Sequence, residues 1–208
     1  KSSSVIKSFE RDWEFLTTRF PTAALLGEGA FKRVYKARNA RLGCAEAISV
    51  MDIDFIQASG NTSVGTELSV AAKLSSLARR NICPNFVIIR GTFTCPFKPP
   101  KSHWELGKKD FMSTPKKRHP REPGSKHRGN YQYIRMEVCD EGDVEEYLKR
   151  QPDQRISSHD AKQLLFQMAF SLHVAGDRYA LKHYDIKLLN FFLQKAVPDS
   201  TDAQNHPF

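Results

Sequence analysis

The fold is decided by one glycine-rich stretch, Gly27-Glu28-Gly29-Ala30-Phe31-Lys32-Arg33-Val34-Tyr35. Apolar residues precede the glycines and alternate with polar residues after them, which predicts a strand, a tight turn and a second strand over residues 25–38. Because glycine has no Cβ, backbone N–H groups in such a turn can approach phosphate oxygens closely. The pattern alone is a weak indication of a phosphate site. It is not a Walker loop, because no Gly-Lys-Ser/Thr sequence opens a helix here.

The segments on either side of this hairpin predict strands first and helices afterwards. Beyond a turn at 41–43, the expected strands are 45–51, 86–89 and 131–138. The expected helices are 66–80, 144–150 and 159–175, with 9–20 as a short helix or an extended lead-in. This order predicts an α+β fold with segregated lobes.

Composition places the chain among ordinary globular proteins, with 208 residues, 40% hydrophobic and 26% charged. No apolar run of about 18 residues occurs, which excludes a membrane-spanning helix. The first residues lack the apolar core of a secretion signal. The four cysteines (Cys44, Cys83, Cys95 and Cys139) form no C-x-x-C pair. This argues against a zinc site or a disulfide framework and favours an intracellular location, cytoplasmic or nuclear.

Positive charge is concentrated in residues 96–130, which carry ten Lys or Arg against three acidic residues, about +7 of the net charge of +9. Rich in Pro and Gly, this segment is expected to be a long mobile insertion. It is either a solvated insert or a docking arm for acidic partners, phosphoinositide head groups or nucleic acid. His103, Trp104 and Phe111 could stack on bases, but the rest of the chain is nearly neutral, so nucleic acid is not the expected partner.

A second segment carries chemistry: His183-Tyr184-Asp185-Ile186-Lys187-Leu188-Leu189-Asn190-Phe191-Phe192-Leu193. It places a carboxylate, an ammonium group and an amide on one loop that precedes an apolar strand. Following the glycine hairpin in this order, it resembles the eukaryotic protein kinase domain over about residues 21–195.

The resemblance implies an architecture and a reaction. Residues 1–20 would be an N-terminal extension. Residues 21–139 would be an N-lobe and hinge with an antiparallel five-stranded sheet and one main helix, and 140–208 would be a partial, mostly helical C-lobe. The implied cofactors are ATP and Mg²⁺. The implied reaction transfers the γ-phosphoryl group to a protein hydroxyl, and Lys187 points to Ser/Thr specificity.

The same resemblance assigns roles to individual residues. Asp185 would orient and deprotonate the acceptor hydroxyl, Lys187 would stabilise the transferring group, and Asn190 would hold the magnesium ion. The remaining residues would contact the nucleotide. Gly27 and Gly29 would cover the phosphates, and Leu26 and Val34 would lie on either side of adenine. The backbone of Glu137 and Cys139 at the hinge would bind the adenine edge, and Asp143 would contact the ribose.

The phosphate-binding lysine departs from the kinase pattern. Kinases carry it in the third strand, where this chain has Glu46-Ala47-Ile48-Ser49. Lys32 instead replaces the third glycine of the loop, a double change that resembles the with-no-lysine kinases. Because strand residues alternate faces, Lys32 shares a face with Val34, and Glu67 on the following helix would pair with it. The alternative is that Lys32 is a solvent-facing turn lysine.

Two further departures bear on activity. Tyr184 replaces the arginine that precedes the catalytic aspartate in kinases, which suggests control without activation-loop phosphorylation. No Asp-Phe-Gly follows Asn190, so magnesium would lack its second carboxylate. The activation segment, the Ala-Pro-Glu motif and the rest of the helical lobe are absent too, so the helix 159–175 would keep an uncovered apolar face. Two accounts stay open. The chain is a piece of an active kinase, or it is a catalytically impaired, pseudokinase-like scaffold that binds nucleotide or protein partners.

Overall fold

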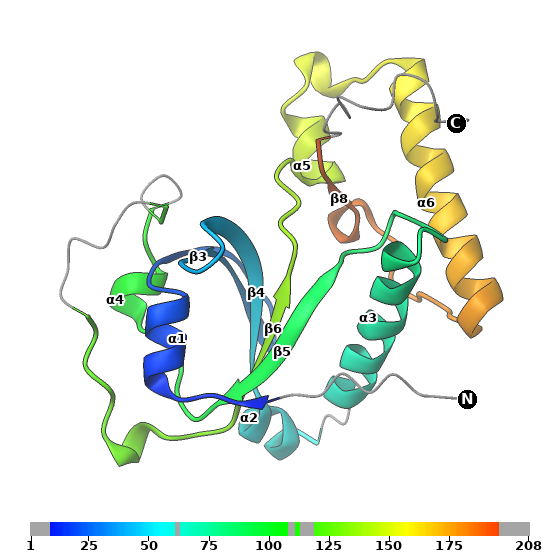
Figure 1. Cartoon of the computed structure of the whole chain (residues 1–208). Coiled ribbons are helices and arrows are strands. Elements are labelled where there is room, and N and C mark those ends of the chain that lie inside the picture. Colours follow the sequence, from blue (N-terminus) through cyan, green and yellow to red (C-terminus); the bar gives the residue numbers. More distant parts are fainter. Residues whose placement is uncertain (1–8, 61–62, 108–110, 113–118, 196–208) are drawn as a thin grey trace. The chain divides into compact units, whose positions relative to one another are not determined.

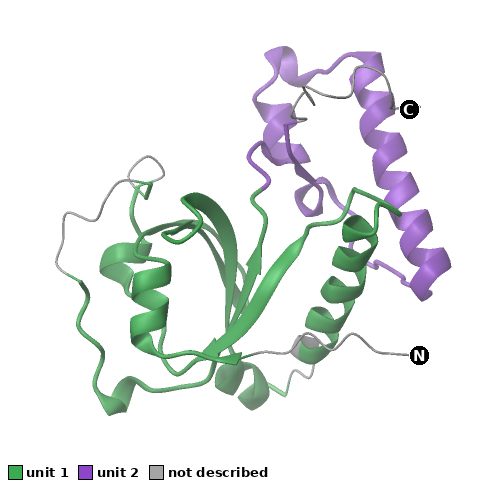
Figure 2. Ribbon diagram, in the orientation of Figure 1, with its two compact units in different colours: residues 1–138 green, residues 139–208 purple. Residues whose placement is uncertain are grey.

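The computed structural model describes residues 9–60, 63–107, 111–112 and 119–195. The chain divides into two compact units, unit 1 over residues 1–138 and unit 2 over residues 139–208 (Figure 2). This division falls one residue before the boundary expected after Cys139.

Unit 1 is built on a six-stranded sheet with the order β1-β5-β6-β4-β3-β2 (Figure 1). The strands are β1 Phe9–Glu10, β2 Ala23–Glu28, β3 Lys32–Asn39, β4 Cys44–Asp52, β5 Ile89–Cys95 and β6 Tyr131–Met136. The α+β class is confirmed, and β2 to β6 pair antiparallel as expected. The expectation of five antiparallel strands is wrong, because β1 adds a sixth strand parallel to β5. A two-residue strand is too short to show any alternation in sequence.

Four α-helices accompany the sheet among the described residues of unit 1: α1 Trp13–Arg19, α2 Ile53–Ala58, α3 Ser63–Arg79 and α4 Lys101–Trp104. Helix α1 begins at Asp12, whose side chain accepts a hydrogen bond from the Phe15 N–H at 2.7 Å. Helix α2, which the sequence analysis missed, begins directly at the end of β4. Asp52 caps it by accepting from the Phe55 N–H at 3.1 Å.

The sheet has an apolar core on each face. On one face, Leu68 and Ala71 of α3 pack against a cluster that contains Met51, Ile89 and Ile134. The other face is covered by α1 and by aromatic side chains of the 97–104 segment. Its largest fully buried members are Leu16, Phe20, Ile48, Phe97, Trp104 and Tyr133.

Two expectations about flanking segments are corrected by this second core. Residues 9–20 do not form an extension, because Trp13, Leu16 and Phe20 are buried in unit 1. The basic insert is not wholly solvated either, since His103, Trp104 and Phe111 are buried and therefore not available for stacking on bases. The insert residues 108–110 and 113–118 lie outside the described part of the chain.

The position of β5 also differs from the expected strand at 86–89. The strand starts at Ile89 and continues to Cys95, past a register shift between Ile89 and Gly91. The apolar run Phe86-Val87-Ile88 only leads into it. Arg90 and Gly91 interrupt the hydrophobic pattern of the true strand, which is why periodicity placed it too early.

Unit 2 is mostly helical, with α5 Val144–Lys149, α6 Ser158–Tyr179 and a small antiparallel pair, β7 Gly142–Asp143 with β8 Phe192–Leu193. Three-residue 3-10 turns occur at Pro152–Gln154 and Leu188–Asn190, as at Ser125–His127 in unit 1. On α6, Leu165 is 65% exposed, whereas Leu164, Met168 and Leu172 on the same side are half-buried, so the expected apolar face is only partly uncovered. None of the described helices combines the length and the apolar character needed to cross a membrane.

Candidate functional site

The glycine hairpin leaves open space above its backbone. Strands β2 and β3 pair in the register Gly27 with Val34 and Glu28 with Arg33, and the Gly29 N–H donates to the Lys32 carbonyl at 2.8 Å. Neither Gly27 nor Gly29 has a positive φ, and a Cβ at either position would meet nothing closer than 3.8 Å. Packing within the fold therefore does not require glycine at these two positions, and the backbone there is open to close approach from outside.

Lys32 lies on the sheet face that α3 covers. In the β3–β4 register, Lys32 is opposite Met51 and Val34 is opposite Ser49, so these side chains share one face. Met51 belongs to the core cluster that Leu68 and Ala71 of α3 complete. Strand alternation in the sequence predicts this shared face for Lys32 and Val34, and the register confirms it.

Lys32 forms an ion pair with Glu67 of α3, the partner expected from the sequence. The two side chains are 44% and 46% exposed, so water screens their attraction and the pair adds little to stability. The ion pair therefore holds an oriented, accessible ammonium group on β3, the second strand of the glycine hairpin. It also disfavours the alternative of a lysine that merely faces solvent.

Ser49, at the position of the usual kinase lysine, is only 5% exposed. Its Oγ has no hydrogen-bond partner among the described residues. A buried hydroxyl without a partner costs free energy, and it supplies no charge. Lys32 of β3, which shares this face with Ser49, instead places an ammonium group there.

The hinge residue Glu137 makes hydrogen bonds of its own within unit 1. The Glu137 N–H donates to the Ile88 carbonyl at 3.0 Å, and the Glu137 carboxylate accepts from the Ile88 N–H at 2.7 Å. The Glu137 N–H is therefore already occupied. Of the side chains expected around adenine, Leu26 is 46% exposed at a register shift of β2, and Val34 is half-buried.

In unit 2, the three polar side chains of the second motif converge. The Lys187 Nζ lies 2.9 Å from Asp185 Oδ2, and the Asn190 amide donates to the same oxygen at 2.9 Å and to the Asp185 carbonyl at 2.8 Å. The hydrogen bond from Lys187, followed by that from Asn190, holds the pKa of Asp185 below its ordinary value. Asp185 is thus an oriented, ionised carboxylate.

The backbone next to Asp185 is strained. Tyr184 has φ 61° and is 88% exposed, a conformation that a bulky side chain adopts only at a cost. His183 supports the loop by stacking on Phe191 and by accepting the Asp185 N–H at 3.3 Å. Strain held in place beside a polar cluster is frequent at functional sites.

Asp143 has a structural task in unit 2. Its carboxylate accepts the Glu146 N–H at 2.8 Å and so caps α5, and its backbone pairs with Phe192 of β8. This pairing ties the segment after the hinge to the strand that follows Asn190. The expected ribose contact of Asp143 would have to share a carboxylate that already caps a helix.

The residues present do not complete a magnesium site. Among the described residues, no group of three or more His, Cys, Asp or Glu side chains is close enough to hold a metal ion. The Asn190 amide nitrogen is engaged by Asp185, which leaves one amide oxygen as a neutral ligand. Magnesium prefers charged oxygen ligands, so the residues present do not fit this ion.

Comparison with known proteins does not assign the chain to a family. No protein-family model matches it, and a search of curated proteins finds no significant relative. The kinase resemblance consequently rests on its two motifs and on the side-chain contacts described above.

Proposed function

We propose that the chain is an ATP-dependent protein kinase-like domain that transfers the γ-phosphoryl group to Ser/Thr hydroxyls of a protein substrate. The observation that carries the proposal is the ion pair between Lys32, on the second strand of the glycine hairpin, and Glu67 of α3. The oriented carboxylate of Asp185 in unit 2 supports it independently.

Phosphoryl transfer depends on positioning and charge stabilisation more than on covalent chemistry. Lys32, oriented by Glu67, would bind the α- and β-phosphates. The open backbone at Gly27 and Gly29 would lie against the phosphate oxygens.

Asp185 would accept a hydrogen bond from the substrate hydroxyl and take up its proton as the new oxygen–phosphorus bond forms and the bond to ADP breaks. Its lowered pKa makes it a weak base, so orienting the hydroxyl is its main contribution. Lys187 already contacts this carboxylate and would stabilise the negative charge on the transferring group.

The test is transfer of label from γ-labelled ATP to a general protein substrate such as casein. Asp185→Asn should lower the transfer rate by about 100-fold or more, because the hydroxyl loses the acceptor that orients it as well as its base. Asp177→Asn, which changes a 67% exposed aspartate on α6, is the matched control and should leave the rate unchanged. ATP binding without measurable transfer in the unmodified chain would contradict catalysis.

A second candidate function is a non-catalytic scaffold that binds nucleotide and engages a protein partner, with the basic 96–130 segment as the surface for an acidic one. It is favoured by the incomplete set of metal ligands among the described residues. The scaffold predicts ATP binding that depends on Lys32 but no labelled product.

A further inference from the structure

A pocket lies on the sheet face of unit 1 that α1 covers. Its volume is about 370 Å³, within the range of about 300–1,000 Å³ that small-molecule sites occupy. Its floor consists of the buried side chains of Tyr35 on β3, Val50 on β4 and Tyr131 on β6, which belong to the core cluster that α1 completes. The rim is formed by the tip of the glycine hairpin (residues 28–33), by Phe55 of α2 and by residues of the 98–101 segment.

The floor of this pocket faces away from the proposed nucleotide site. Tyr35 follows Val34 along β3, and Val50 follows Ser49 along β4, so the two sets of side chains lie on opposite faces of the sheet. The β3–β4 register, which pairs Val34 with Ser49, agrees with this division. Lys32 stands at the hairpin tip and borders the pocket at its rim.

Two neighbouring aromatic side chains at the rim stay exposed. Phe31 of the hairpin tip is 41% exposed and Phe55 of α2 is 57% exposed, and their ring centroids are 6.4 Å apart. Because aromatic rings gain free energy from burial, two exposed rings beside a pocket mark a place where an apolar group can bind. With the ring of Tyr131 in the floor, they favour a ligand that carries a flat ring.

Basic side chains outnumber acidic ones around the pocket. The charged lining residues are Lys32, Arg33, Lys98 and Lys101 against Glu28 and Asp52. Three of the four basic residues already have an acidic partner. Arg33 pairs with Glu28 at 2.7 Å, and Lys32 pairs with Glu67 of α3. The Lys98 Nζ lies 3.5 Å from Asp52 Oδ2 and 5.5 Å from the centre of the Tyr131 ring.

Lys101, the first residue of α4, is the remaining basic residue of the lining. It is exposed, and it forms no ion pair within the part of the chain that the structure describes. Glu105, one helical turn further on, is 3.6 Å from Arg33 instead. The rim therefore offers one ammonium group that can pair with an anionic ligand.

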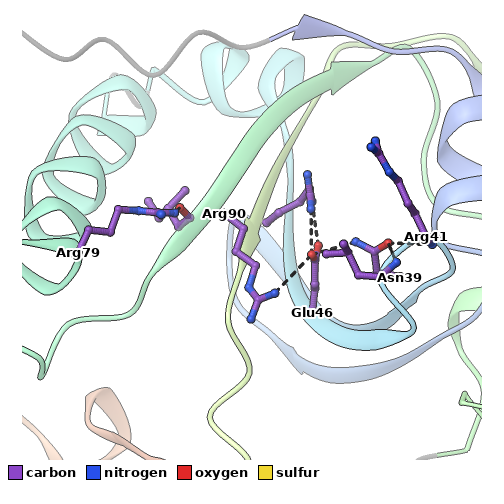
Figure 3. Close-up of polar contacts among 8 residues, drawn as sticks. Asn39, Arg41, Glu46, Arg79 and Arg90 are labelled. Atoms are coloured by element: carbon purple, nitrogen blue, oxygen red, sulfur yellow. Dashed lines mark hydrogen bonds and ion pairs between the residues drawn. The ribbon is translucent and has the colours of Figure 1, made fainter.

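A charged cluster at the other end of β4 is, by contrast, satisfied by the fold itself. Glu46 lies on the same face as Val50 and is fully buried. Its carboxylate accepts two hydrogen bonds from Arg135, both at 2.8 Å, and one from Asn39 at 2.9 Å. Arg90 adds a third positive neighbour, with its Nη1 3.9 Å from Glu46 Oε1 (Figure 3). That carboxylate has its counter-charges within the chain and needs no ligand.

We propose that the pocket binds a small aromatic carboxylate. Its ring lies against Phe31 and Phe55, and its carboxylate accepts a charge-assisted hydrogen bond from Lys101. A single negative charge matches the one lining lysine without an acidic partner, whereas a dianion would leave one charge unpaired. Because the floor lies on the opposite face of the sheet from the proposed nucleotide site, binding here does not depend on phosphoryl transfer.

The test compares naphthoate with the matching neutral alcohol, naphthylmethanol, on the whole chain at constant ionic strength. Calorimetry measures the affinity, and NMR of labelled aromatic rings locates the ligand. Naphthoate should bind with a dissociation constant below about 1 mM, and at least about tenfold more tightly than the alcohol. It should shift the ring resonances of Phe55 and Tyr131.

Lys101→Gln tests the charged contact. It should weaken the binding of naphthoate about tenfold and leave the binding of the alcohol unchanged. Lys126→Gln is the matched control, because it removes the same charge from an exposed lysine of the basic insert that does not line the pocket. It should bind both compounds as the parent does.

Phe55→Ala tests the apolar contact and should weaken the binding of both compounds severalfold. Phe9→Ala is its matched control, since the ring of Phe9 on β1 is 55% exposed and does not line the pocket. Both rings are more than half exposed, so the thermal midpoint of either variant should stay close to that of the parent. This measurement separates lost binding from lost folding.

Three results would each overturn the proposal. The first is an absence of shifts at Phe55 and Tyr131 at the solubility limit of naphthoate. The second is equal affinity of the parent for naphthoate and for the alcohol. The third is naphthoate binding that Lys101→Gln or Phe55→Ala weakens no more than its matched control does.

Discussion

Lys32 of β3 and Glu67 of α3 form an ion pair across 35 residues of sequence, on the same sheet face as the buried Ser49. The usual kinase lysine would stand at Ser49, one strand away, and the β3–β4 register puts Val34 directly opposite it. A lysine on β3 can therefore serve the same face of the sheet. This relationship is the basis of the proposed nucleotide site.

Glu67→Gln separates ligand binding from stability. Because both side chains of the ion pair are more than two-fifths exposed, the free energy of unfolding should change by no more than about 0.5 kcal/mol. The affinity for ATP should fall severalfold, since Lys32 loses the group that orients it. Urea denaturation and nucleotide calorimetry measure the two effects. Glu145→Gln breaks another exposed pair, with Lys149, and should change neither quantity.

Ser49→Ala should stabilise the protein. The Ser49 hydroxyl is buried and has no hydrogen-bond partner among the described residues, so its removal relieves a desolvation cost of about 1 kcal/mol. ATP affinity should not change. A higher midpoint in thermal unfolding checks the first point, and a clear loss of ATP binding in this variant would show that Ser49, not only Lys32, serves the nucleotide.

Glu46→Gln should destabilise unit 1 by about 3 kcal/mol at neutral pH, because it leaves Arg135 without its counter-charge. Burial raises the pKa of Glu46, but the hydrogen bonds and charges of Arg135, together with Asn39 and Arg90, bring it below its ordinary value. A lowered pKa in the folded state adds stability above the unfolded value of about 4.5, and this stability is lost as the pH falls through the folded pKa.

The pH dependence provides the control for this prediction. Unfolding curves of the parent should lose stability below about pH 4.5, and Glu46→Gln should remove part of that loss. Glu105→Gln, at a 36% exposed residue paired with Arg33, should leave both the stability and its pH profile unchanged. Equal behaviour of the two variants would mean that the buried pair does not contribute.

Asp185 should titrate below the ordinary range for aspartate, because Lys187 and Asn190 stabilise its charged form. Its carboxylate therefore stays ionised throughout the physiological pH range. Lys187→Met should raise this pKa toward the ordinary value by removing the larger contribution. Carboxyl-carbon NMR follows the titration directly. An Asp185 signal that titrates normally in the parent would contradict the clustered geometry.

Local pattern predicted the parts of the fold that are regular over several residues. Alternation over residues 25–51 predicted β2 to β4 and placed Lys32 on the face of Val34, and helical spacing predicted α3 and α6. The parallel strand β1 was missed because two residues carry no period. Helix α2 was missed because it follows β4 without an intervening loop.

Contacts between residues that are far apart in the sequence could not be predicted from local sequence pattern. Trp104 lies in a segment whose charge and Pro content suggested a solvated insert, yet its indole is buried and its Nε1 donates to the Phe20 carbonyl at 2.9 Å. Glu46 and its partners Arg90 and Arg135 come from three separate strands, and only the pairing of β4, β5 and β6 brings them together.

The most direct test of the central claim is ATP binding by calorimetry to the parent, to Lys32→Met and to Lys73→Met, which changes an exposed lysine on α3. We predict binding to the parent and to Lys73→Met with equal affinity, and at least tenfold weaker binding to Lys32→Met, in line with loss of one charge-assisted contact. Equal ATP affinity of Lys32→Met and the parent, or no binding to any of the three, would contradict the assignment of Lys32 to a nucleotide site.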